Sequence, residues 1–231
     1  MSLEKVQSDF YDSTSLISPI LETIESAKIQ ANRNQDRIKL IAVSKNVESN
    51  KILDVIKSGH RDFGENRVQE TLSKWPDICK KHPDIKLHLI GPLQTNKVRD
   101  AVSIFNTIHS LDRRKLAEVL AKEFDRTGNR LECFVQVNIG EESQKTGISP
   151  NQTNEFVKFC INEHKIPVIG LMCIPPADKD PGPYFAFLFE IAKKNKLAEL
   201  SMGMSRDYQT AISFGATQVR VGSAIFGSRN K

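Results

Sequence analysis

Short apolar runs recur along the chain, and segments with apolar residues at helical spacing separate them. The run at 40–43 contains β-favouring or small residues without polar alternation, which is typical of a strand buried on both faces in a parallel sheet. The run at 131–139 is the longest of the predicted strands. The segment 15–34 carries apolar residues three and four positions apart, which indicates a helix. The predicted strands are 40–43, 62–66, 87–90, 107–109, 131–139, 168–173, 200–203 and 217–221.

Strand and helix segments alternate along the chain without a linker or a compositional break. Because consecutive β-α units impose parallel strands, the predicted fold class is α/β, as a single (β/α)8 barrel of the TIM type. We expect one domain over residues 1–231, with a leading N-terminal helix at 15–34. A doubly wound open sheet is the alternative, but no G-x-G-x-x-G motif follows an early strand and there is no P-loop.

Local signals set some of the expected boundaries. Ser49 and Asp112 precede helical segments and are expected to cap them. Gly59 is expected to end the helix around 52–56. Pro76 and the lysines after it predict a turn.

Composition and charge narrow the class of protein. The net charge of +5 comes from 33 basic and 28 acidic residues scattered along the chain, so we expect a mild preference for phosphate and no nucleic-acid partner. The four cysteines have neither the spacing of a zinc site nor that of a disulfide framework. No apolar run approaches ~18 residues and no hydrophobic signal segment opens the chain, so we expect a cytoplasmic protein without a membrane partner.

Lys45 is the first candidate for chemistry, because it ends the apolar run 38–45. Ligands bind at the carboxyl ends of the strands in barrels. A lysine that is partly desolvated there has a lowered pKa, and its neutral amine becomes a nucleophile toward an aldehyde. The alternative is a lysine that only points into water.

A phosphate site is the second candidate. Ser205 and Ser223 lie after the predicted seventh and eighth strands, where barrels commonly bind phosphate, and each follows a glycine-containing segment. Gly222 permits close backbone approach, whereas the alternative makes these residues turn and capping residues. Arg220, between two valines, requires a partner if it is buried. An amine, a phosphate site and a hydrogen-bond donor between them are the contacts that pyridoxal 5′-phosphate (PLP) needs.

Several motifs in fixed order resemble one family, the pyridoxal phosphate homeostasis proteins of the YggS/PROSC group, over nearly the whole chain. The motifs are Ala-Val-Ser-Lys at 42–45, Phe-Gly-Glu-Asn at 63–66, the segment 88–97, His-Ser-Leu-Asp-Arg at 109–113, Lys-Thr-Gly at 145–147, Leu-Ser-Met-Gly-Met-Ser at 200–205 and the segment 220–227.

The resemblance implies a barrel like the N-terminal domain of alanine racemase, with PLP as its cofactor. It implies an internal aldimine on Lys45 and Arg220 facing the pyridine nitrogen. Ser205, Gly222 and Ser223 would hold the phosphate. Asn66 looks like an additional asparagine beside the cofactor. The segment Asn-Val-Glu at 46–48 departs from the family pattern, which leaves open the loop conformation beside Lys45.

The function implied is intracellular PLP (vitamin B6) homeostasis, by a protein that holds PLP as a Schiff base and passes it to PLP-dependent apoenzymes. One alternative is a PLP-dependent amino-acid racemase, and another is a Schiff-base barrel enzyme acting on a phosphorylated metabolite. Racemisation requires an acid/base group on each face of the cofactor. In alanine racemase a second domain supplies the group opposite the lysine, and we expect no counterpart here among Tyr11, Tyr184 and Tyr208. We therefore assign no catalytic residue and no metal.

Overall fold

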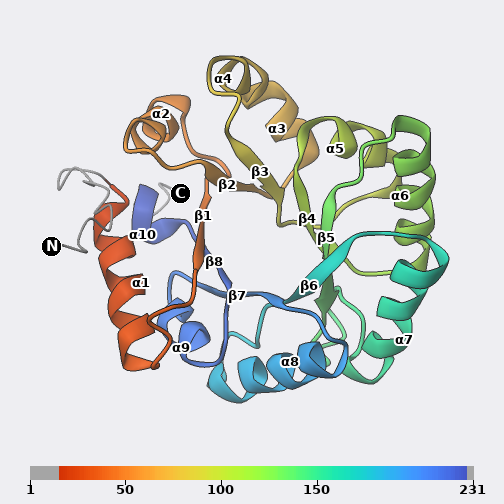
Figure 1. Ribbon diagram of the computed structural model, residues 1–231. Coiled ribbons are helices and arrows are strands. Elements are labelled where there is room, and N and C mark those ends of the chain that lie inside the picture. Colours follow the sequence, from red (N-terminus) through yellow and green to blue (C-terminus); the bar gives the residue numbers. More distant parts are fainter. Residues whose placement is uncertain (1–15, 228–231) are drawn as a thin grey trace, which may run out of the picture.

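The computed structural model describes residues 16–227, and within them eight parallel strands close into a barrel in sequence order (Figure 1). The pairing of β8 with β1, which sets Arg220 beside Ile41, closes the sheet. The prediction of a single (β/α)8 barrel is confirmed. The strands are β1 Lys39–Val43, β2 Asp62–Glu65, β3 Lys86–Leu89, β4 Thr107–Leu111, β5 Glu132–Val137, β6 Val168–Cys173, β7 Glu199–Met204 and β8 Gln218–Val221.

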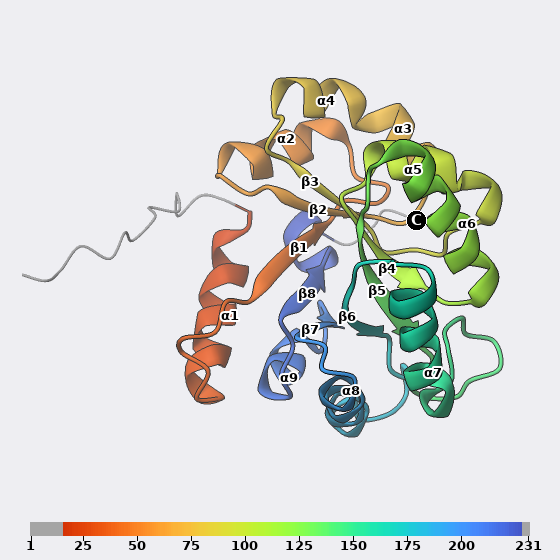
Figure 2. The ribbon, with the colours of Figure 1, turned by 45° about the vertical axis from the view of Figure 1, so that its right-hand side comes forward.

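Helices surround the barrel, and α1 packs against α9 on the side where β8 meets β1 (Figures 1 and 2). The helix that follows β8, α10, has only four residues. α1 therefore covers a side of the barrel that a longer helix after β8 would otherwise cover. The α-helices are α1 Ser18–Gln30, α2 Ser49–Lys57, α3 Val68–Lys74, α4 Pro76–Lys81, α5 Val98–Ile104, α6 Arg114–Thr127, α7 Thr153–Lys158, α8 Gly182–Lys194, α9 Tyr208–Ser213 and α10 Ser223–Phe226.

Several local boundaries differ from those expected. Pro76 opens helix α4 instead of a turn, because proline at the first helical position loses no helical hydrogen bond. Ser49 is the first residue of α2 and makes no side-chain cap. Asp112 does not cap α6, since its carboxylate pairs with Arg113 instead.

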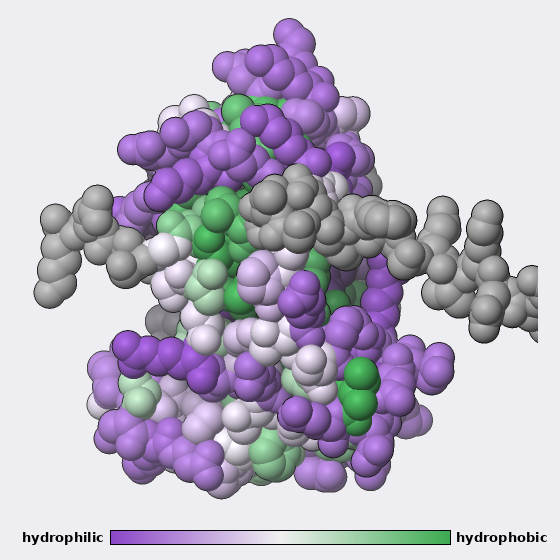
Figure 3. All heavy atoms as spheres, turned by 90° about the vertical axis from the view of Figure 1, so that its left-hand side faces the viewer, coloured by the Kyte–Doolittle hydropathy of each residue, from purple (hydrophilic) through white to green (hydrophobic). Residues whose placement is uncertain are grey.

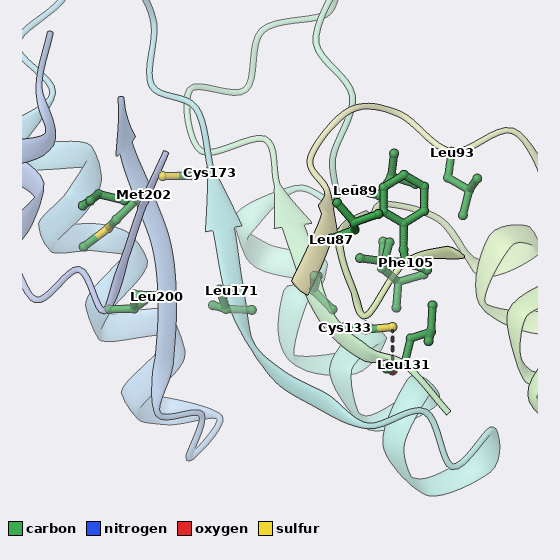
Figure 4. Close-up of a cluster of buried hydrophobic side chains, with 14 of the residues drawn as sticks. Leu87, Leu89, Leu93, Phe105, Leu131, Cys133, Leu171, Cys173, Leu200 and Met202 are labelled. Atoms are coloured by element: carbon green, nitrogen blue, oxygen red, sulfur yellow. Dashed lines mark hydrogen bonds between the residues drawn. The ribbon is translucent and has the colours of Figure 1, made fainter. Parts of the chain in front are cut away.

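The strands are buried on both faces, but the two faces differ in chemistry. Alternate residues that point outward join the apolar layer between barrel and helices, as Figure 4 shows for several strands. These residues include Leu87, Leu89, Leu171, Cys173, Leu200 and Met202. The positions between them include His88, Ser201 and Arg220, all buried without belonging to that layer. The interior of the barrel therefore contains polar groups that must find partners inside the protein.

Hydrophilic residues dominate the face shown in Figure 3, and hydrophobic atoms occupy a smaller area between two hydrophilic regions. None of the helices within residues 16–227 combines the length and the apolar character needed to cross a bilayer.

Candidate functional site

Lys45 lies in the turn that follows β1, at the carboxyl end of the barrel. The turn begins where the Ser44 N–H donates to the Gly64 carbonyl of β2, at 3.0 Å. Asn46, the next residue, has a φ of 56°, a left-handed conformation that asparagine tolerates better than most residues. Its N–H donates to Glu70 Oε1 at 2.6 Å. The segment that departs from the family pattern thus forms a defined turn that presents Lys45.

The buried carboxylate of Glu65 stabilises this turn through Ser44. Glu65, the last residue of β2, is fully buried. Its Oε1 accepts hydrogen bonds from Ser44 Oγ at 2.8 Å and Trp75 Nε1 at 2.9 Å, and Lys74 Nζ lies 2.7 Å away. Lys74 also donates to the Ser44 carbonyl at 2.8 Å. The backbone immediately before Lys45 is therefore tied to β2 and α3.

The two segments predicted to bind phosphate meet in the structure. The Gly222 N–H donates to Ser205 Oγ at 3.3 Å. A Cβ on Gly222 would lie 3.2 Å from both the Cβ and the carbonyl oxygen of Val43, so glycine allows β8 to end directly against β1. Lys45, Gly222 and Ser223 line one cavity of about 360 Å³. The structure therefore brings the lysine together with part of the predicted phosphate site.

The other predicted residues lie outside the lining of that cavity. Asn66 is half-buried, directly after β2, and its backbone lies so close to Gly91 that a Cβ on Gly91 would be 2.3 Å from the Asn66 oxygen. A larger cavity of about 770 Å³ is lined by residues at the amino ends of β7 and β8, including Leu200 and Thr217. It contains none of the predicted site residues, so its size does not make it the functional site.

Arg220 points into the barrel and is 3% exposed. Its Nη1 donates to Ser201 Oγ at 2.6 Å and its Nη2 to the Cys173 carbonyl at 2.9 Å. Burial lowers the pKa of this guanidinium from its ordinary value, but an arginine in a protein keeps its proton. No residue within 16–227 accepts a hydrogen bond from the Arg220 Nε–H, which leaves this donor available to a ligand.

Two buried histidines, which the sequence analysis did not assign, extend the contacts of Arg220. His109 Nδ1 lies 2.8 Å from Ser201 Oγ, and His109 Nε2 lies 3.0 Å from His88 Nδ1. Desolvation lowers the pKa of both imidazoles, so both are neutral near pH 7. The sequence feature that could have identified these histidines is a histidine flanked by outward-facing apolar residues of a strand, as in Leu87-His88-Leu89.

The chain is similar to known proteins over most of its length. Residues 24–230 match the family model described as the alanine racemase N-terminal domain. The pyridoxal phosphate homeostasis protein of Aquifex aeolicus is 37% identical over 222 residues, which cover 92% of this chain and 96% of that protein. The corresponding protein of Haemophilus influenzae is 38% identical over 221 residues, covering 91% and 93%.

A solved structure gives the same fold. PipY of Synechococcus elongatus PCC7942, with PLP bound, is 34% identical, with a TM-score of 0.75 over 88% of this chain and 100% of that chain. The family model and the shared fold show that the chain is a barrel of the alanine racemase N-terminal type. Within that class, the chain belongs to the pyridoxal phosphate homeostasis protein family.

We expect the ion pair between Lys74 and Glu65 to be important for stability. Lys74→Met leaves the buried Glu65 carboxylate without its cation, which should lower the free energy of unfolding by about 3–5 kcal/mol. Adding Glu65→Gln to Lys74→Met should recover most of this loss, because the amide carries no charge. Trp75 is the only tryptophan and is fully buried, so its fluorescence during urea unfolding reports the transition.

Lys57→Met is the matched control, since Lys57 pairs with Asp54 at the surface with 75% of its side chain exposed. That change should cost less than about 1 kcal/mol. A Lys74→Met protein no less stable than the Lys57→Met protein would contradict the role given to Glu65.

Proposed function

We propose that this protein binds PLP at the carboxyl end of the barrel and serves in PLP homeostasis, with Lys45 bonded to the aldehyde carbon. The observation that carries the proposal is the shared cavity of Lys45, Gly222 and Ser223, with the buried Arg220 on β8, the strand that Gly222 directly follows. The relative with PLP bound supports the choice of ligand.

The residues present fit the chemistry of PLP. Ser205 and Ser223 offer hydroxyl and backbone N–H donors, Gly222 permits close backbone approach, and together they would hold the phosphate. The Nε–H of Arg220 would donate to the pyridine nitrogen, and Asn66 would contact the cofactor beside the ring. When bound, PLP supplies an electrophilic aldehyde and a ring that can withdraw electrons.

Arg220 favours a holding role over turnover. A protonated guanidinium that donates to the pyridine nitrogen keeps that nitrogen unprotonated, which makes the ring a poorer electron sink for a carbanion. We therefore propose a carrier or regulator that passes PLP to apoenzymes in the cytoplasm, from one barrel domain over residues 1–231. Racemisation is the alternative that an experiment must exclude.

Lys45→Ala should abolish covalent retention of PLP, because the amine that bonds to the aldehyde is removed. The measurement is borohydride reduction of the PLP-incubated protein, followed by mass spectrometry of its peptides. Lys51 lines the same cavity from α2, so Lys51→Ala is the control and should retain the adduct. A reduced pyridoxyl group found chiefly on a lysine other than Lys45 in the native protein would refute the assignment.

Gly222→Val should weaken PLP binding at least tenfold, equivalent to about 1.4 kcal/mol, because the new side chain would crowd Val43 and intrude on the phosphate site. Equilibrium titration of PLP measures the affinity, and thermal unfolding checks that the variant folds. Ala224 is exposed on α10 and does not line the cavity. Ala224→Val adds similar bulk nearby and should leave the affinity unchanged, whereas equal affinities for both variants would argue against this phosphate site.

The PLP-loaded protein should not exchange the α-proton of L-alanine at an enzymatic rate. Neither Tyr184 nor Tyr208 lines the cavity of Lys45, and its other titratable residues, Glu48 and Lys51, belong to the segment that follows Lys45. Loss of a positioned proton donor typically costs about 10²–10⁴-fold. Proton NMR in heavy water measures the exchange; inversion with deuterium incorporation at enzymatic turnover would favour the racemase alternative.

A further inference from the structure

Hydrogen-bonded side chains form one continuous path through the barrel, from Asp62 on β2 to Arg220 on β8. Asp62 Oδ1 lies 2.9 Å from His88 Nε2, and His88 Nδ1 lies 3.0 Å from His109 Nε2. His109 Nδ1 lies 2.8 Å from Ser201 Oγ, which is 2.6 Å from Arg220 Nη1. Among residues 16–227, the buried side-chain atoms that lack a partner include none from this path.

The donors and acceptors fix the direction of every hydrogen bond in the path. Arg220 can only donate, so Ser201 Oγ accepts from it and its hydroxyl hydrogen turns to His109 Nδ1. His109 then carries its proton on Nε2 and donates to His88 Nδ1. His88 in turn carries its proton on Nε2 and donates to the Asp62 carboxylate. Each donor has one acceptor when both imidazoles are neutral and protonated on Nε2.

Other protonation states leave a buried group unsatisfied. A proton on His109 Nδ1 would make Ser201 Oγ accept twice and would leave the hydroxyl hydrogen without an acceptor among residues 16–227. A positive charge on either histidine is opposed by full burial, which lowers the pKa of both. Phe134 also stacks on the His109 ring at 4.4 Å between centroids, which holds the ring plane. The arrangement is therefore specified by chemistry and by packing.

The two ends of the path lie in different surroundings. Asp62 is the first residue of β2, at the amino end of the barrel, with 24% of its side chain exposed and Lys39 Nζ 3.6 Å from Oδ1. Arg220 is two residues before Gly222, toward the carboxyl end. Hydrogen bonds that run in one direction polarise one another. An anion at the Asp62 end thus strengthens the acceptor that Ser201 offers to Arg220.

We infer that Asp62, His88, His109 and Ser201 form a one-way hydrogen-bond chain that positions the Arg220 guanidinium for the ligand at the carboxyl end. These four are positioning residues, since they act through Arg220 and not on the ligand. The inference rests on the proposed function for the identity of that ligand, but the chain itself is a property of the protein without it. A change at Asp62 therefore alters the hydrogen bonding of Arg220 through this chain.

The test uses the full chain labelled with ¹⁵N-histidine and ¹⁵N-arginine, without PLP. Long-range nitrogen–proton NMR should show His88 and His109 as neutral rings protonated on Nε2 at pH 7. Ser201→Ala should accelerate exchange of the Arg220 Nε–H with water at least tenfold, and Ser201→Thr should restore it. Asp62→Asn should give His88 a second tautomer, because an amide can donate as well as accept.

Ser110→Ala is the matched control, because Ser110 is a buried strand serine that donates to the Gly91 carbonyl outside the chain. It should leave Arg220 exchange unchanged. A His109 protonated on Nδ1, or the same exchange rate in Ser201→Ala and wild type, would overturn the inference. If Ser201→Ala does not fold, the wild-type tautomers and the Asp62→Asn protein still decide the question.

PLP loading separates this inference from the proposed function. With PLP added, Ser201→Ala should shift the absorption maximum of the bound cofactor, and Ser201→Thr should return it. A protein that shows the expected tautomers and Arg220 exchange but forms no adduct at Lys45 would refute the proposed function and leave the chain intact. An adduct with an unaltered spectrum in Ser201→Ala would refute the positioning role alone.

Discussion

The buried positive charge of Arg220 determines which polar groups must surround it inside the barrel. A guanidinium removed from water is costly unless each surrounding contact compensates it. Here the Cys173 carbonyl and the Ser201 hydroxyl accept two of its hydrogen bonds, and Ser201 is in turn matched by His109. Because the groups that accept these hydrogen bonds are neutral, the positive charge of Arg220 is not cancelled by them. A carboxylate directly on Arg220 would have cancelled it.

Around Lys45, side-chain hydrogen bonds hold the turn that follows β1. Turns at barrel ends carry function but have few hydrogen bonds of their own. In this protein Glu65 and Lys74 anchor Ser44, while Glu70 receives the Asn46 N–H. The backbone on both sides of Lys45 is therefore held by side chains of β2 and α3.

The two arrangements meet where β8 ends against β1. Gly222 lies against Val43 because it lacks a side chain. The end of β8 can therefore approach β1, the strand that leads to Lys45. A barrel fold by itself supports many activities. In this barrel, Lys45, Gly222 and Ser223 line one cavity where β8 ends against β1, and the buried Arg220 lies on β8.

The amino-acid sequence alone was sufficient for the barrel and for where Lys45 and Gly222 fall within it, because strand periodicity and strand order are local or topological properties. It was not sufficient for the helix caps, since Arg113 competes for Asp112, nor for α4, where a proline signal fits a turn and a helix start equally well. The buried partners of Arg220 were also missed. His109 and Ser201 are 92 residues apart, and only closure of the barrel brings them within hydrogen-bonding distance. Polar contacts on an inner face depend on register across several strands, which no local pattern encodes, so the tertiary structure decided them.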